Sequence, residues 1–274
     1  IMRHITAVFV CASLAAHSQT LYISQFGAVG DGLTNDQAAF EAASSYIASL
    51  GGNCELVIEA GTYIVGHQYG DAANYLTNKP IVHLLGLSNV TIRGEVDPES
   101  GARLSTIKYK DCLKYGTFHP PTGNRLLADG SNACMLVDGS ESQLCAELNA
   151  CIHVEGCDKI AVRDIILNGN SERYIVGGKY GESGIQAEAD GLMVKNSKNV
   201  TVDNVDANGF GRDGILLFAT ASFGTGDMHF AMTNSHFDWN GRNAMTWGGG
   251  SGASVESCYF GHTAMGYCHS SPGA

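Results

Sequence analysis

Three copies of one short pattern constrain this chain more than any other feature of its sequence. The copies are Asp190-Gly191-Leu192-Met193-Val194, Asp213-Gly214-Ile215-Leu216-Leu217 and Asn243-Ala244-Met245-Thr246-Trp247. The steps between them are 23 and 30 residues. A unit of that length cannot bury an apolar face alone and must stack on its neighbours, as the units of a solenoid do. Alternating β-branched and aromatic residues, with Gly and Asn at the corners, predict short strands. We therefore expect an all-β fold, a parallel β-helix.

An amphipathic helix is expected ahead of these repeats. Thr34 as N-cap and Gln37 three residues later match a capping box, and Gly51-Gly52 ends the helical pattern. Its apolar face consists of Phe40, Ala43, Ile47 and Leu50. Such a helix would cover the open N-terminal end of the coil, where unpaired strand edges invite aggregation. Further along, Asn89 and Asn199 are expected at corners, where Asn tolerates left-handed backbone and bonds to the next coil.

The opening of the chain resembles a known superfamily. The residues that carry the resemblance are Phe26-Gly27-Ala28-Val29-Gly30-Asp31-Gly32, Thr34-Asn35-Asp36 and Ala60-Gly61-Thr62-Tyr63. Together they are similar to the start of pectate lyase superfamily proteins, which include pectate lyases, polygalacturonases and phage tailspikes. The resemblance implies a right-handed, single-stranded parallel β-helix with an N-terminal capping α-helix. It does not fix the chemistry, because one fold hosts many functions.

Composition and the N-terminus indicate export. Residues 1–18 read as a signal peptide: Arg3 and His4 precede an apolar run that is shorter than the ~20 residues of a membrane-spanning helix. Residues 19–274 then form one domain, secreted, periplasmic or at the cell surface, with no membrane partner after cleavage. The formal net charge of −11 argues against nucleic acid as a partner. The C-terminal residues show no cap, so we expect the solenoid to be truncated there.

The cysteines fit an oxidising compartment. Eight of the nine cysteines lie after the signal, and an even number suits disulfides, although eight thiols allow 105 pairings. Cys112 with Cys134 and Cys258 with Cys268 are the local pairings expected. The alternative is that Cys serves as a small apolar residue in the interior. No paired C-x-x-C spacing suggests zinc, and no metal ligand is predicted with certainty.

The first candidate for catalysis is a column of acids. If Asp190 and Asp213 occupy one corner of successive coils, their backbones lie ~4.8 Å apart. Two carboxylates that close can act as the acid and base of glycosidic bond hydrolysis. Residues 188–191 and 212–214 are also similar to polygalacturonase motifs, which implies catalysis by Asp190 and Asp213. Arg212 stands where that family has a further Asp, and Arg242-Asn243-Ala244 stand where it has Gly-His-Gly.

Two other interpretations of this column stay open. Asp190, Asp213 and Asn243 could hold Ca²⁺, with Arg212 or Arg242 acting at C5 of a uronic acid in a lyase or epimerase reaction. Alternatively, Asp190 has the strand phase of the inward-facing Leu192, and the acids then only cap the corner by bonding backbone amides.

A second cluster comprises His236, Asp238, Trp239 and Asn240. His236 is a candidate acid or base, and Trp239 or Trp247 a platform for a sugar ring. Two insertions, residues 95–150 and 170–189, are expected to wall the binding face, with Tyr174 and Lys179 as contacts. Arg242 and Asn243 are the remaining predicted sugar contacts.

The sequence thus predicts a secreted enzyme that acts on a polysaccharide, by hydrolysis through Asp190 and Asp213 with Arg212 and His236. A calcium-dependent lyase or C5-epimerase is one alternative. A non-catalytic adhesin or tailspike-like fibre that binds glycans is the other.

Overall fold

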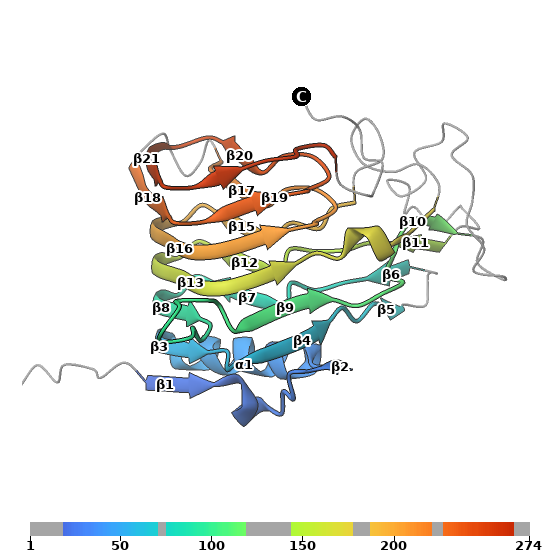
Figure 1. Ribbon diagram of the computed structural model, residues 1–274, viewed down its shortest axis with the longest axis horizontal. Coiled ribbons are helices and arrows are strands. Elements are labelled where there is room, and N and C mark those ends of the chain that lie inside the picture. Colours follow the sequence, from blue (N-terminus) through green and yellow to red (C-terminus); the bar gives the residue numbers. More distant parts are fainter. Residues whose placement is uncertain (1–18, 71–74, 119–143, 178–186, 221–226, 266–274) are drawn as a thin grey trace, which may run out of the picture.

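The chain forms a right-handed parallel β-helix, as predicted (Figure 1). The computed structural model describes residues 19–70, 75–118, 144–177, 187–220 and 227–265. The coils stack from the N-terminal end, where the helix α1 (Gln37–Leu50) lies, toward β20, β21 and β22 at the other end. The predicted signal, residues 1–18, lies outside the described residues. Within them, no helix is long and apolar enough to cross a membrane.

Most strands belong to two sheets that wrap the core. Sheet A contains β1 (Gln19–Tyr22), β2 (Asp31–Asn35), β3 (Gly52–Val57), β4 (Gly61–Val65), β8 (Ser88–Arg93), β9 (Ser105–Tyr109), β13 (Asp158–Asn168), β16 (Lys198–Asn208), β18 (Asp227–Thr233), β19 (His236–Asp238), β21 (Ser251–Glu256) and β22 (Tyr259–Phe260). Sheet C contains β7 (Val82–Leu85), β12 (Ile152–Glu155), β15 (Leu192–Lys195), β17 (Ile215–Phe218) and β20 (Met245–Gly248). All pairings within these two sheets are parallel.

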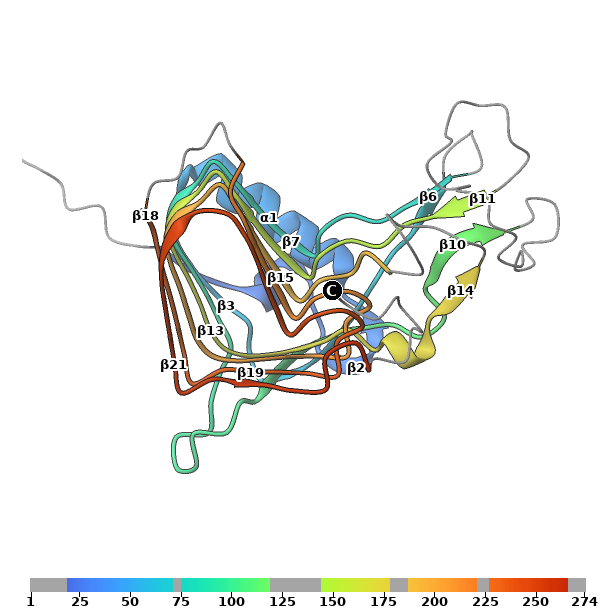
Figure 2. The same ribbon diagram turned by 90° about the horizontal axis from the view of Figure 1, so that it is seen from above.

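Seen along its axis, the coil has three sides (Figure 2). Sheet C forms one side, and sheet A bends to form the other two. The bend falls at Asp164, Asn204 and Asn234, which have φ of 61°, 53° and 51°. Asx residues tolerate this left-handed conformation better than most. Asn89 and Asn199, predicted at corners, also have positive φ and bond to Asn53 and Asp158 of the preceding coil. The predicted left-handed conformation is confirmed, whereas the bonds run to the preceding coil and not to the next one.

Alternation of buried and outward-facing residues along many of the strands fills the core. In β12, Ile152 and Val154 are buried, while His153 and Glu155 face outward. The same alternation stacks Leu192 on Ile215 in the next coil. Burial of these aliphatic columns, at about 25 cal/mol per Å² of apolar surface, is the main force that holds one coil on another.

The helix α1 covers the N-terminal edge, as predicted, but its start differs from the prediction. The residue before the helix is Asp36, not Thr34. The Asp36 carboxylate accepts hydrogen bonds from the amides of Val29 and Gly30, and the Thr34 hydroxyl donates to Asp31. Thr34 is thus engaged in the preceding turn and cannot cap the helix. On the buried face, Ser44 accepts a bond from the His83 amide at the edge of sheet C.

The two predicted insertions meet in a small third sheet outside the coil. Sheet B contains β5 (Tyr69–Gly70), β6 (Tyr75–Thr77), β10 (Lys114–Phe118), β11 (Leu144–Ala146) and β14 (Ile175–Gly177). Pairing of Lys114 with Ile175 joins one insertion to the other (Figure 2). Two short 3₁₀ helices, η1 (Ile23–Phe26) and η3 (Ser171–Arg173), complete the described elements. The first insertion is shorter than predicted, because β9 lies within residues 95–150 but pairs with β4 and β13 of the coil, and Tyr109 and Tyr115 are buried.

Five cysteines whose side chains the structure describes are free thiols. They are Cys54, Cys112, Cys151, Cys157 and Cys258. Cys151 is fully buried, and burial raises the pKa of its thiol. This fits the alternative in which Cys fills the interior as a small apolar residue. Cys134 and Cys268, the expected disulfide partners of Cys112 and Cys258, lie outside the described residues.

Candidate functional site

The three copies of the repeat stack as the sequence predicts. Leu192 pairs with Ile215, and Ile215 with Met245. Asp190, Asp213 and Asn243, each two residues earlier, therefore occupy the same corner of successive coils. Each is followed by a residue of small volume because the coils approach closely there: a Cβ on Gly191 would lie 2.5 Å from the Gly214 carbonyl oxygen.

The two aspartates of this column are sealed inside the protein. Both have a relative exposure of 0%. Asp190 accepts two hydrogen bonds from the Arg212 guanidinium, at 2.9 and 2.6 Å, and a third from the Asp213 amide. Asp213 repeats the arrangement one coil later with Arg242 and the Asn243 amide. We call this set of five residues the aspartate–arginine ladder.

The ladder corresponds to the corner-capping interpretation of the sequence. Carboxylates without solvent contact cannot reach a glycosidic oxygen, so this geometry does not support Asp190 and Asp213 as acid and base. Ca²⁺ does not fit either, because the oxygens it would need are already occupied by guanidinium and amide donors. Burial alone would lower the pKa of Arg212, but Asp190 raises it above its usual value, which argues against Arg212 as a base.

The other predicted sugar contacts near the ladder are also engaged in the fold. The Asn243 amide group donates to the Thr246 hydroxyl. Trp247 is half-buried against the core, and its indole N–H points to the Gly250 carbonyl. Tyr174 likewise packs on the core from the η3 segment. Lys179 lies outside the described residues.

The second predicted cluster lies along β19, just before the corner that holds the ladder. Trp239 is exposed and His236 half-buried, whereas Asp238 is 8% exposed and Asn240 is fully buried, with its side chain bonded to the Phe210 amide and the Ala207 carbonyl. Strand phase puts Ala207 and Phe237 in the core, so Asp206, Asn208 and His236 face outward. Trp239 follows β19 with φ of 53° and is 38% exposed. Its indole lies flat on the His262 imidazole, with centroids 4.0 Å apart and planes 7° apart.

A polar groove of about 260 Å³ runs up to this indole. Its lining is Lys108, Asn168, Asn170, Ser171, Glu172, Asn208, Gly209 and Trp239. Lys108, Asn168, Asn208 and Asp238 are in register on four neighbouring strands, so the groove follows the helix axis. We call it the Trp239 groove.

Titratable groups form a continuous chain beside the Trp239 groove. His236 Nδ1 lies 3.3 Å from Asp206 Oδ1, and His236 Nε2 lies 3.9 Å from Asp238 Oδ2. Asp238 Oδ1 is 2.8 Å from His262 Nδ1. The structure thus places Asp206 and Asp238 on either side of the His236 imidazole, whose ring stacks on Tyr259 with centroids 4.7 Å apart.

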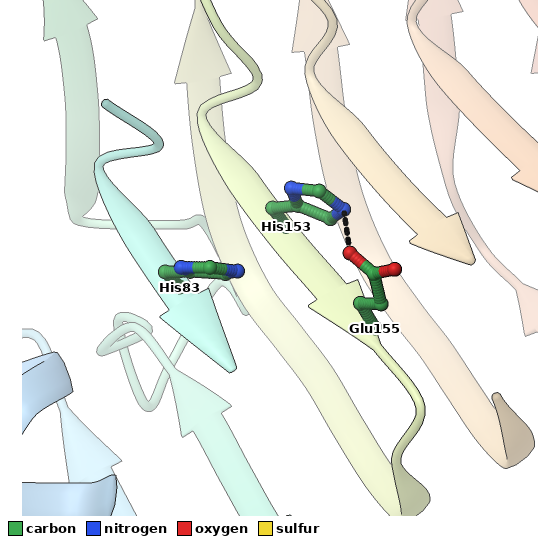
Figure 3. A group of neighbouring side chains, drawn as sticks. All are labelled: His83, His153 and Glu155. Carbon is green, nitrogen blue, oxygen red and sulfur yellow. Dashed lines mark ion pairs between the residues drawn. The ribbon is translucent and has the colours of Figure 1, made fainter. Parts of the chain in front are cut away.

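A third group, which the sequence analysis missed, lies on the outer face of sheet C (Figure 3). His83 in β7 pairs with His153 in β12, and their rings stack with centroids 5.1 Å apart. Glu155 lies two residues after His153 on the same face, with its Oε2 3.6 Å from His153 Nε2. One ligand atom from each of the three residues lies within 4.8 Å of the others.

The surroundings of this group suit ligand binding. Burial lowers the pKa of His83, and burial with the neighbouring His83 lowers that of His153. A hydrogen bond from Lys195 lowers the pKa of Glu155. A pocket of about 340 Å³ lies between His83 and the helix α1.

The two histidines escaped the sequence analysis because an insertion separates them. They stand 70 residues apart, whereas the detected repeats are 23 and 30 residues apart. The sequence nevertheless contains a shared pattern, an aliphatic residue, His, a second aliphatic residue, any residue and then Gly. It occurs in Val82-His83-Leu84-Leu85-Gly86 and in Ile152-His153-Val154-Glu155-Gly156.

Comparisons with solved structures give distant likenesses. The mannuronan C-5 epimerase AlgE6 A-module of Azotobacter vinelandii is 17% identical over 86% of this chain and 62% of that chain, with a TM-score of 0.42. The family 28 exopolygalacturonase of Yersinia enterocolitica is 16% identical over 88% and 53%, with a TM-score of 0.40. The exopolygalacturonase of Thermotoga maritima is 12% identical over 81% and 59%, with a TM-score of 0.30. The chain thus spans less than two thirds of each of these three structures.

The family of this chain is shown by its match to a family model. No curated protein matches the chain. The model described as rhamnogalacturonase A/epimerase, pectate lyase-like, matches residues 22–265, which is nearly the whole sequence. This chain belongs to that family.

Proposed function

We propose that this protein is a polysaccharide-acting enzyme that binds its substrate along the Trp239 groove and hydrolyses glycosidic bonds there. The observation that carries the proposal is the row of Asp206, His236 and Asp238, which ends at the partly exposed Trp239. Membership of a family named for a rhamnogalacturonase and an epimerase supports a polysaccharide as the substrate.

The groove has the chemistry of a sugar site. Sugar rings present apolar faces to aromatic side chains and hydroxyl groups to amides and charges. Trp239 offers the aromatic face, held flat by His262. Asn168, Asn208 and Lys108 offer donors and acceptors at the spacing of successive coils, which suits an extended chain better than a single small molecule.

Hydrolysis requires two carboxyl groups that play different roles. Asp206 is paired with Arg103 and accepts a bond from Asn208, whereas Asp238 contacts His262 and the amide of Trp239. Two carboxylates in unequal surroundings can divide the roles of acid and base between them. We assign that pair to Asp206 and Asp238, with His236 between them, in place of the buried Asp190 and Asp213.

The test is activity on a panel of plant, algal and microbial polysaccharides, with new reducing ends as the readout. Asp206→Asn and Asp238→Asn should each lower kcat about 100-fold to 10,000-fold, the usual contribution of a general acid or base. Asp203→Asn is the matched control, since Asp203 lies on the same strand but bonds only to Thr233 and Asn234 at the bend. It should leave kcat unchanged. Melting temperatures of all variants establish that they are folded.

Trp239→Ala should raise KM more than it lowers kcat, because the indole is assigned to binding. Three results would overturn the proposal. One is loss of activity in Asp190→Asn with wild-type activity in Asp238→Asn. The second is a product that absorbs as an unsaturated uronate, which indicates a lyase. The third is glycan binding without any cleavage, which indicates a fibre or adhesin.

A further inference from the structure

The histidine pair on sheet C has no role in the proposed hydrolysis. It lies on a different side of the coil from the Trp239 groove (Figures 2 and 3). His83 and His153 come from neighbouring parallel strands, so the backbone hydrogen bonds of sheet C fix the distance between them. Glu155 is held on the same strand as His153. A rigid scaffold of this kind presents three ligand atoms with little freedom to move apart.

Two of these atoms make no hydrogen bond, although His153 Nε2 lies within ion-pair distance of Glu155 Oε2, at 3.6 Å. Nε2 of His83 and Nε2 of His153 are both shielded from solvent, and neither makes a hydrogen bond. A buried nitrogen without a partner costs about 1–3 kcal/mol. In the next two strands, β15 and β17, the equivalent positions are held by Met193 and Leu216, whose side chains have no polar N–H or oxygen to satisfy. The orphaned nitrogens therefore point to a ligand.

We propose that His83, His153 and Glu155 bind a divalent transition-metal ion, with Zn²⁺ the best fit. Two imidazoles and one carboxylate suit zinc and its neighbours rather than Ca²⁺, which takes oxygen ligands. In a tetrahedral site with bonds of about 2.0–2.1 Å, the ligand atoms lie roughly 3.4 Å apart. The separation of 3.6 Å between His153 Nε2 and Glu155 Oε2 is already close to that value.

The neighbours complete the site. Lys195 donates to Glu155 Oε1 at 2.8 Å, which leaves Oε2 directed toward His153. Outer residues that orient a ligand in this way are usual around protein-bound metals. A pocket of about 340 Å³ borders His83 on the side of the helix α1, so one of the three ligands adjoins solvent-filled space. Three protein ligands with one open position distinguish an exchangeable or reactive metal site from a closed structural one.

The test is titration of the chelator-treated full chain with ZnCl₂ alone, followed by calorimetry. The wild type should bind one equivalent that the His83→Ala/His153→Ala double variant loses, with affinity for that equivalent reduced roughly 100-fold or more. His229→Ala, at an exposed position of β18, should bind as the wild type does. Co²⁺ in place of Zn²⁺ should give the visible absorption of a four-coordinate site in the wild type and in His229→Ala, but not in the double variant.

Glu155→Gln serves as a second variant, because it changes one atom of a half-exposed side chain and should fold even if the double variant does not. It should weaken Zn²⁺ binding about tenfold or more. The proposal is overturned if the wild type binds no equivalent, or if both sets of variants keep wild-type stoichiometry and affinity. Because the readout is metal binding, either outcome is independent of whether Asp206 and Asp238 catalyse hydrolysis.

Discussion

At the scale of single residues, the aspartate–arginine ladder shows that a catalytic site and a structural contact can have the same residue types at the same spacing. Asp190 and Asp213 are stacked as a pair of catalytic acids would be, but each is buried with the arginine of the following coil. The glycines after them are not required for a left-handed turn. Gly191 and Gly214 do not adopt positive φ, and they are needed because the next coil leaves no room for a Cβ.

The ladder leads to a stability prediction. Arg212→Ala would leave the Asp190 carboxylate buried without its cation, so the free energy of unfolding should fall by about 3–5 kcal/mol. Arg163→Ala is the control, because Arg163 also pairs with acids but has a side chain 41% exposed. Exposed pairs contribute about 0–1 kcal/mol. Denaturant unfolding measures both.

The double variant Asp190→Asn/Arg212→Met checks the cause. Removal of both charges should restore much of the stability lost in Arg212→Ala, because no uncompensated charge then remains. Equal losses in Arg212→Ala and Arg163→Ala would show that the ladder does not hold the coils together.

At the scale of elements, the helix α1 was predictable and its attachment was not. The period of the apolar residues and the two glycines at its end were enough to place it. The contacts that fix it to the coil come from polar groups: Gln37 accepts from the amides of Gly66 and His67, and Ser44 accepts from the His83 amide. Gln37 had been assigned to a capping box, because a local pattern carries no information about a partner 29 residues away.

Gln37 gives the prediction for this element. Gln37→Leu should lower the free energy of unfolding by about 1–3 kcal/mol for each amide left without an acceptor. The side chain is 1% exposed, so water cannot take its place. Ser45→Ala, on the exposed face of the same helix, should change stability by less than about 0.5 kcal/mol. A loss of similar size in both variants, measured by calorimetric unfolding, would mean that α1 is held by its apolar face alone.

The difference between local patterns and partners distant in sequence also explains how much of the site could be predicted from the sequence. His236 and Trp239 were found because they lie a few residues apart, and strand phase places them on the outside. Asp206 joins them only through the pairing of β16 with β19. His83 and His153 needed the pairing of β7 with β12 across a long insertion. A repeat of constant period shows from the sequence alone which side chains are in register. The insertion between His83 and His153 interrupts the period, so their register could not be predicted.

At the scale of the whole molecule, the repeat predicted the architecture because each coil contacts only its neighbours. A solenoid's stability is then close to a sum of coil and interface terms. Coils in the middle have two neighbours, and the last described coil has one: all six residues of β21 are exposed, and β21 pairs with β18 alone. Sheet B breaks this regularity, since it joins segments of both insertions with β5 and β6, outside the coil.

This arrangement predicts a gradient of stability along the axis, which one matched pair of residues can measure. Phe237 and Phe260 stack in the same column of adjacent coils, with centroids 5.7 Å apart, yet Phe237 is 0% exposed and Phe260 is 39% exposed. Phe237→Ala should cost about 3–5 kcal/mol, whereas Phe260→Ala should cost much less, because its ring still contacts water in the folded state. Hydrogen exchange should agree, with the amides of β13 and β16 protected longest and those of β21 exchanging first. Uniform protection along the axis would instead require one cooperative unit that includes the last coil, and the nearest-neighbour description of this β-helix would then be wrong.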